Sequence, residues 1–322
     1  MSSRNILKNL QKSAVATVFV FAAILQASPC ALAANESDLL FEGYHKLMSG
    51  GVHIGYTISR YEYDPKSKKF TATIFTKTGA LGSDVTESTH AVADADLNPV
   101  SYEYTAMVGK DIKTIDAKFK KNHMSAVVKE KGKIQKIEQD IPKGVFLSQF
   151  LIYLMLKSKN GLQADLNYKY KAIAEEDGKF YDGQALVTKQ EKYNGYPAFK
   201  ILNNYKDLKF VAYVTDRGEV LGVTNPAQNL AIELKPKPND ATGQFGVGAS
   251  ILRNLFGDVP LGTHNVLSRA MKAEALKPEE PENPKRYGVP PGQGIIIKPQ
   301  PAPPVPAPAQ PQPTEKEKKK NE

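Results

Sequence analysis

The sequence is almost without cysteine: Cys30 is the only one in 322 residues, and tryptophan is missing altogether. Cys30 falls in an N-terminal segment that we expect to be removed, which leaves a mature chain without a thiol. Disulfide bonds, thiolate catalysis and cysteine-based metal sites are then excluded. The five histidines show no metal-binding or catalytic spacing. We therefore expect no metal, no cofactor and no catalytic residues.

Phosphate-binding and nucleic-acid-binding signals are also missing. The glycine-spaced segment Gly243–Gly248 lacks the Lys-Ser/Thr that ends a phosphate-binding loop, and it is typical of a linker. The chain is only mildly basic, which does not indicate nucleic-acid binding. The expected class is a non-enzymatic protein. An enzyme that acts on envelope polymers remains an alternative.

Residues 1–33 have the three parts of a secretory signal peptide. Three basic residues and no acidic one come first, followed by the apolar run Ala14–Leu25 and the small-residue sequence Ala31–Ala33. Removal of the three basic residues lowers the formal net charge from +9 to +6. The mature chain is predicted to begin at Ala34 and to reside in the periplasm or cell envelope.

Lipidation of Cys30 is an alternative to simple cleavage. A lipidated cysteine follows a short box of apolar and small residues, and the residues here are Ala27, Ser28 and Pro29. Proline directly before the cysteine fits such a box poorly, so cleavage after Ala33 is preferred.

Residues 34–235 are predicted to form one antiparallel β domain. In the run Val100–Val108 the even positions are apolar or aromatic and the odd positions mostly polar, which is the pattern of a strand with one wet face. Similar runs are separated by short turns, and short connections favour antiparallel neighbours. We expect seven or eight strands, a core helix, and about five further strands that return to the same sheet.

The most apolar stretch of the mature chain is Val145–Leu156, in which ten of twelve residues are apolar or aromatic. Such a segment has no polar face and must be buried. As a helix it would be only ~18 Å long, well short of the ~30 Å hydrocarbon core of a bilayer. We predict a core helix over 145–157 that either fills the interior or lines an apolar groove. The fold class is mainly β: a strongly curved antiparallel sheet, half-barrel or open barrel, wrapped around this helix.

Two segments follow the β domain. Residues 236–276 are predicted to contain a hinge and two short amphipathic helices, Ala249–Phe256 and Asn265–Leu276, which either cover the sheet or bind a partner or membrane surface. Residues 277–322 contain thirteen of the 22 prolines and end in a lysine-rich sequence, which predicts a disordered, extended tail.

The tail contains a candidate partner motif, Ile295, Ile296 and Ile297. Three β-branched residues in a row suit strand addition to the edge of another sheet. Alternatively, the triplet is an incidental part of a linker or folds back on its own domain.

Tyrosine is the one enriched class, with fifteen residues. Most are expected to pack within the sheet, but a concave sheet lined with them would hold an acyl chain or an extended peptide. The candidate ligand-groove residues are Tyr102, Tyr104, Phe150, Tyr153, Leu154 and Tyr213. Lysine-rich turns such as Lys66–Lys69 are expected to be solvated, with attraction to anionic lipid headgroups as the alternative.

Three stretches together resemble a family of uncharacterised exported β-rich domains: Ser49–Gly55, Leu97–Tyr102 and Tyr213–Val223. These domains are similar in architecture to the half-barrel lipoprotein carriers of the periplasm. The resemblance covers about residues 40–235 and implies a curved antiparallel sheet that holds helices in its concavity and binds acyl chains. The acidic Asp-x-Leu-Ser entry before the helix is here Asp140–Lys143, and no ligand residue is carried over.

The leading functional hypothesis is an exported binding or scaffold protein that holds a lipid or a lipoprotein acyl chain in its concave sheet. The alternative is an envelope adaptor whose Pro/Lys-rich tail binds peptidoglycan or a protein partner.

Overall fold

The computed structural model describes residues 38–79 and 84–276. The predicted signal peptide and the tail with its Ile295–Ile297 motif lie outside these residues. The strands are β1 (Asp38–Ser49), β2 (Val52–Asp64), β3 (Lys69–Thr78), β4 (Val85–Asp94), β5 (Pro99–Val108), β6 (Asp111–Lys120), β7 (His123–Glu130), β8 (Lys133–Asp140), β9 (Phe146–Leu147), β10 (Asn167–Ala174), β11 (Lys179–Tyr193), β12 (Tyr196–Tyr205), β13 (Leu208–Val214), β14 (Val220–Asn225) and β15 (Leu230–Lys235). The helices are η1 (Ser148–Phe150), α1 (Leu151–Lys157), η2 (Pro226–Gln228), α2 (Pro238–Thr242), α3 (Ala249–Phe256) and α4 (Val266–Ala275), where η marks a 3-10 helix.

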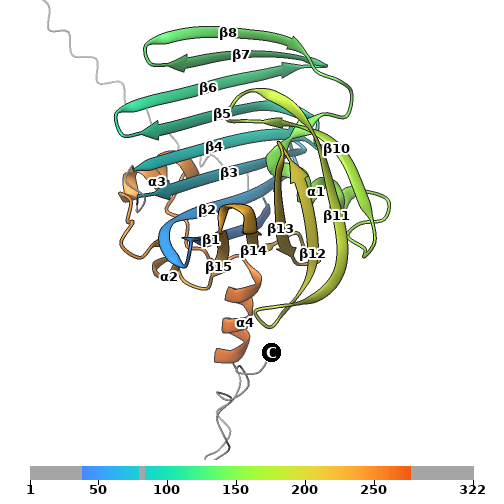
Figure 1. The fold of residues 1–322 in the computed structure, drawn as a ribbon, viewed down its shortest axis with the longest axis vertical. Coiled ribbons are helices and arrows are strands. Elements are labelled where there is room, and N and C mark those ends of the chain that lie inside the picture. The colour runs from blue at the N-terminus through green and yellow to red at the C-terminus, as the bar shows by residue number, and fades with distance from the viewer. Residues whose placement is uncertain (1–37, 80–83, 277–322) are drawn as a thin grey trace, which may run out of the picture. The chain divides into compact units, whose positions relative to one another are not determined.

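All fifteen strands belong to one sheet, in the order β8-β7-β6-β5-β4-β3-β2-β1-β15-β14-β13-β12-β11-β10-β9 (Figure 1). Every strand pair is antiparallel except β9 with β10. Strands β8 and β9 are the two edges, so the sheet is not closed into a barrel. The strands after the apolar segment return to the first half through β15, which pairs with β1. The mainly antiparallel β architecture expected from the alternating sequence is confirmed.

Buried and more exposed residues alternate along the strands, so one face of the sheet is buried. In β4 the buried residues are Thr89, Ala91 and Ala93, with half-buried residues between them. Tight turns join the strands where the sequence allows a left-handed backbone. At the β11–β12 turn Asn194 and Gly195 have φ values of 50° and 87°, the two positive values that a type I′ hairpin requires.

The apolar run at 145–157 is only partly helical, so the predicted helix was too long. Phe146 and Leu147 form β9, which pairs in parallel with Ala172 and Ile173 of β10. The helical part begins at Ser148 as η1 and continues as α1 to Lys157. A buried strand and a buried helix both consist of continuous apolar residues, and here the free edge of β10 supplies the backbone partners that draw Phe146 and Leu147 into the sheet.

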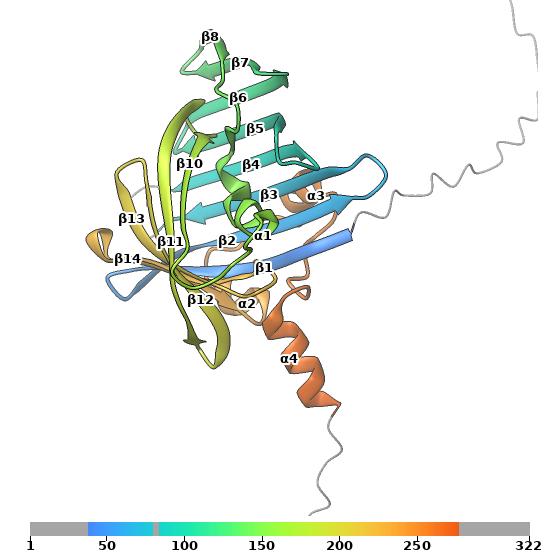
Figure 2. The same cartoon turned by 90° about the vertical axis from the view of Figure 1, so that its right-hand side faces the viewer.

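Helix α1 packs against both halves of the sheet. Leu151 and Leu156 contact a cluster built mainly from β3–β10, and they also contact a cluster from β11–β14. Met155 is fully buried in the second cluster. Figure 2 shows α1 between β2–β3 and β10–β11. Side chains of this one short helix therefore contact residues from both halves of the sheet.

Helices α2 and α3 cover the face of the sheet opposite α1, which we call the outer face. Helix α3 has the bounds predicted from the sequence, and its Leu252 and Phe256 pack against Tyr56, Ile58 and Phe75 of β2 and β3. The predicted hinge contains α2, in which Ala241 is buried in the same cluster. Helix α4 contributes Val266 and Leu267 to a separate cluster with Leu221 and Leu234.

A buried ion pair attaches this C-terminal segment to the first two strands. Arg60 of β2 donates to Glu42 of β1, to the Phe256 carbonyl oxygen at 2.9 Å, and to Asp258 at 2.7 Å. The backbone N–H of Gly262 donates to the second oxygen of Glu42 at 2.5 Å. Because each buried charge has several partners, residues 256–262 are fixed to the outer face of the sheet.

Candidate ligand-binding site

An apolar cavity of about 220 Å³ lies between η1, α1 and the inner face of β12–β14. We call it the α1 groove, and it is lined by Tyr61, Ser148, Gln149, Leu151, Ile152, Tyr170, Ile201, Asn203, Tyr205, Phe210, Ala212, Val220 and Val223. The strand register brings the residues of the sheet side of the groove together. Ile201, Ala212 and Val223 are directly opposite one another across β12, β13 and β14. Their side chains point to the face on which α1 packs. The groove is thus formed by the helix on one side and a row of small and branched residues on the other.

Three tyrosine side chains line the groove, and their hydroxyls are hydrogen-bonded to the protein. Tyr61 donates to the Gln149 carbonyl oxygen at 3.2 Å and Tyr205 to the Ala172 carbonyl oxygen at 3.1 Å. Tyr170 donates to the Asn203 side-chain oxygen at 2.7 Å, and burial raises the pKa of Tyr170 to about 12. All three phenols have raised pKa values because they are buried, so they stay neutral at physiological pH. A bound molecule meets the aromatic carbon of these rings rather than unsatisfied polar groups.

Gly183 sets the position of the Tyr170 ring. A Cβ atom at this position would lie 2.2 Å from the ring, so only glycine permits the contact. Gly183 is opposite Tyr170 in the β10–β11 register. The pairing lays the aromatic ring flat over the neighbouring strand and places it in the wall of the groove.

A buried carboxyl group lies beside the groove. Glu175 is 1% exposed and follows β10. The Ser148 hydroxyl donates to it at 2.6 Å, and the Gln149 backbone N–H donates at 3.4 Å. Burial raises the pKa of Glu175 from its ordinary value of 4.5 to about 7. Near neutral pH this side chain is present in both its protonated and its charged form.

A second, polar cavity of about 370 Å³ lies on the other side of η1. It is lined by Ile74, Thr76, Glu87, Ser88, Thr89, Tyr104, Gln149, Glu175 and Glu176. The Tyr104 hydroxyl donates to Glu87 at 3.2 Å. Gln149 lines both cavities, so an apolar and a carboxylate-rich compartment are neighbours across one turn of 3-10 helix.

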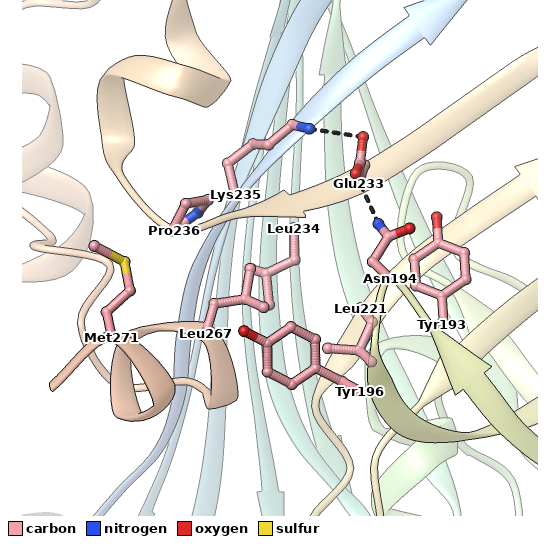
Figure 3. A pocket seen from close by; sticks show the side chains of 10 residues that line it. All are labelled: Tyr193, Asn194, Tyr196, Leu221, Glu233, Leu234, Lys235, Pro236, Leu267 and Met271. Atoms are coloured by element: carbon pink, nitrogen blue, oxygen red, sulfur yellow. Dashed lines mark hydrogen bonds and ion pairs between the residues drawn. The ribbon is translucent and has the colours of Figure 1, made fainter. Parts of the chain in front are cut away.

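A third cavity, of about 250 Å³, lies beneath α4 (Figure 3). Leu221, Leu234 and Leu267 supply apolar side chains, and Met271 lies on the helix side. The rim is polar, with Glu233 bonded to Lys235 at 2.7 Å and to the Asn194 side-chain nitrogen at 2.8 Å. None of the titratable side chains that line this cavity is buried.

The six groove residues predicted from the sequence do not come together in one site. Tyr104 lines the polar cavity. Tyr102, Phe150 and Tyr153 are buried in the core, where the hydroxyls of Tyr102 and Tyr153 have no hydrogen-bond partner among the described residues. Leu154 packs against the same core.

Tyr213 is on the opposite face of β13 from the groove. Its ring stacks on Tyr193 with a centroid separation of 4.2 Å. The neighbouring residue Ala212 lines the groove instead. Sequence reasoning missed Ala212, Val223 and Glu175, and only the strand register and the position of η1 bring these residues together.

Within residues 38–79 and 84–276, no group of histidine, cysteine and acidic residues has the arrangement of a metal site. None of the helices in the same part of the chain is both long and apolar enough to cross a membrane.

Comparisons with known proteins identify no family. No family model matches the sequence, and no curated protein matches it. One solved structure, a beta-barrel-like protein of domain of unknown function DUF1849 from Brucella abortus, is 12% identical, with a TM-score of 0.46 over 60% of this chain and 94% of that chain. Another, a DUF1089 family protein from Pseudomonas aeruginosa, is 11% identical, with a TM-score of 0.35 over 55% of this chain and 91% of that chain. At these scores the two structures define neither a family nor a function for this chain.

Proposed function

We propose that this protein is a binding protein, not an enzyme, and that it holds the apolar chain of a lipid or lipoprotein in the α1 groove. The observation that carries the proposal is the groove itself: about 220 Å³ of space against α1 with a mostly apolar lining. Native interiors contain few voids larger than a water molecule. A cavity of this size therefore fits a function in ligand binding better than one in stability.

The size of the groove indicates what it accepts. Pockets for whole small molecules span roughly 300–1,000 Å³, so about 220 Å³ accommodates part of an acyl chain rather than a complete lipid. Each buried methylene group contributes about 0.8 kcal/mol, so a segment of a few carbons binds with useful affinity. The polar cavity next to Gln149 is the place for the more polar end of an amphiphile.

The finer features predicted from the sequence support the same function. We infer that the sheet is a curved half-barrel around α1, in the manner of the periplasmic carriers that the sequence resembles. Export through residues 1–33 would place the protein among envelope lipids. Binding of peptidoglycan or a protein partner through Ile295–Ile297 remains a prediction from the sequence alone.

Filling the groove is expected to abolish binding of an apolar probe. Val223→Phe places a ring in the wall of the groove, and we expect at least a tenfold rise in the dissociation constant of a fluorescent fatty acid, measured by titration of the full chain. Val211→Phe is the matched control: it makes the same change one strand away, on the outer face where Val211 pairs with Leu202. We expect the control to bind like the unchanged protein.

Other results would assign the ligand to a different cavity or refute binding altogether. Weaker binding in Val211→Phe alone would place the ligand on the outer face of β11–β13. Weaker binding in Leu267→Phe alone would place it beneath α4, since Leu267 lines that cavity. No binding by the unchanged protein would refute the proposed function. Because overpacking a half-buried site typically costs about 1–3 kcal/mol, a thermal melt of each variant shows whether it is folded.

A further inference from the structure

Two hairpin ends on the β5–β8 side of the sheet carry exposed apolar side chains. We define the hairpin ends as residues 107–113 and 129–134. In the first, Met107, Val108 and Ile112 are 41%, 49% and 53% exposed, and in the second Ile134 is 68% exposed. These four are among eleven large apolar side chains that are exposed in the described part of the chain. Their concentration at one end of the sheet distinguishes them from singly scattered surface residues.

The two hairpin ends are neighbours and have tight turns. Lys113 of β6 is opposite Glu130 of β7, and Lys131 lies 3.9 Å from Asp111 across the two turns. Figure 1 shows both turns at the same side of the sheet. Gly132 has a φ of 74° and follows Lys131, at 48°, so the second turn has the left-handed geometry of a two-residue hairpin. Both ends therefore project from the sheet on tight, well-defined turns.

The hairpin ends are also basic. They contain five lysines, at positions 110, 113, 129, 131 and 133, against the two acidic residues Asp111 and Glu130, which leaves a net charge of +3. Lys129 is directly opposite Ile134 in the β7–β8 register, so a charged and an apolar side chain are adjacent. Apolar side chains flanked by long lysines are the combination found where proteins contact the boundary between lipid headgroups and acyl chains.

We propose that the hairpin ends dock on a membrane surface that contains anionic lipid. The apolar side chains enter the boundary of the acyl region, and the lysines contact the headgroup phosphates. A second copy of this chain fits the surface less well, because two ends of charge +3 repel. The inference extends the proposed function without depending on it: a docking surface at the edge and a groove in the interior are tested by different variants.

The test uses the full chain and vesicles of phosphatidylcholine with or without phosphatidylglycerol. A lysine near an anionic surface contributes about 1 kcal/mol, or roughly fivefold in partitioning. The triple variant Lys110→Gln, Lys129→Gln and Lys133→Gln is therefore expected to lower binding to anionic vesicles on the order of 100-fold. The matched control Lys179→Gln, Lys192→Gln and Lys209→Gln removes the same charge from exposed positions on the other half of the sheet. It is expected to change binding by less than fivefold.

A site-specific probe separates the hairpin ends from every other basic part of the chain. An environment-sensitive dye is attached at Ile134→Cys or, as control, at Leu208→Cys, an exposed position on the other half of the sheet, both in a Cys30→Ser background. Anionic vesicles are expected to shift the emission of the first dye to the blue and to leave the second unchanged. Equal binding by both lysine variants, no shift at position 134, or a shift caused by self-association without lipid would each overturn the proposal.

Discussion

Replacing Phe150 by alanine is expected to lower the free energy of unfolding by about 3–5 kcal/mol, the range for removing a fully buried aromatic ring. Phe150 is 0% exposed in η1, and its ring lies 6.5 Å from the rings of both Tyr61 and Phe70. The loss combines the transfer energy of the ring with the cavity that remains, because the strands on either side are held by their own hydrogen bonds and cannot collapse into it. It is a large part of the ~5–15 kcal/mol that typically stabilises a folded domain.

Urea unfolding followed by far-ultraviolet circular dichroism measures this loss. Phe180→Ala serves as control, since Phe180 is only half-buried and stacks under Lys171. We expect it to lose less than half as much stability. A loss below about 1 kcal/mol for Phe150→Ala would show that η1 and α1 are peripheral to the core rather than central to it.

The stability of the protein is expected to depend on pH through Glu175. Its pKa is raised from 4.5 to about 7 by burial, so the folded state binds the proton more tightly than the unfolded state does. The stabilisation from the protonated form is fully present below pH 4.5 and is lost as the pH rises through about 7. Over this interval the contribution amounts to about 3 kcal/mol, at 1.36 kcal/mol for each unit of pKa.

Glu175→Gln isolates this effect because glutamine does not titrate. The difference in unfolding free energy between the variant and the unchanged protein is expected to shift by about 3 kcal/mol in favour of the variant between pH 4 and pH 8. Glu176→Gln removes a carboxylate at the exposed neighbouring position and serves as the matched control. A pH-independent difference for Glu175→Gln would mean that Glu175 has the same pKa in the folded and unfolded states.

Much of the fold follows from patterns that are local in the sequence. Alternation in Val100–Val108 predicted β5, and the spacing of Ile251, Leu252, Leu255 and Phe256 predicted α3 with its observed bounds. Asn194-Gly195 forms a hairpin turn because both residues tolerate positive φ, which is again a property of the two residues themselves. These features depend on neighbouring residues only, so the sequence contains the information needed to find them.

The candidate site depends on information that is not local. Ala212 and Tyr213 are adjacent, and a shift of one residue in a strand exchanges the two faces of the sheet. Composition favoured Tyr213 as a groove residue, whereas the register places Ala212 there. The burial of Glu175 could not be predicted from the sequence either, because this residue belongs to the acidic sequence Glu175-Glu176-Asp177, which is typical of an exposed turn. In the fold its carboxylate accepts a hydrogen bond from the hydroxyl of Ser148, a residue distant in sequence.

The central claim, that the α1 groove holds an apolar chain, is tested most directly by native mass spectrometry of the full chain purified from cells without detergent. The predicted spectrum contains a complex heavier than the protein by the mass of one lipid or fatty acid, which is released on denaturation and absent from Val223→Phe. A spectrum of the bare protein, or an adduct that Val223→Phe retains in full, would contradict the claim.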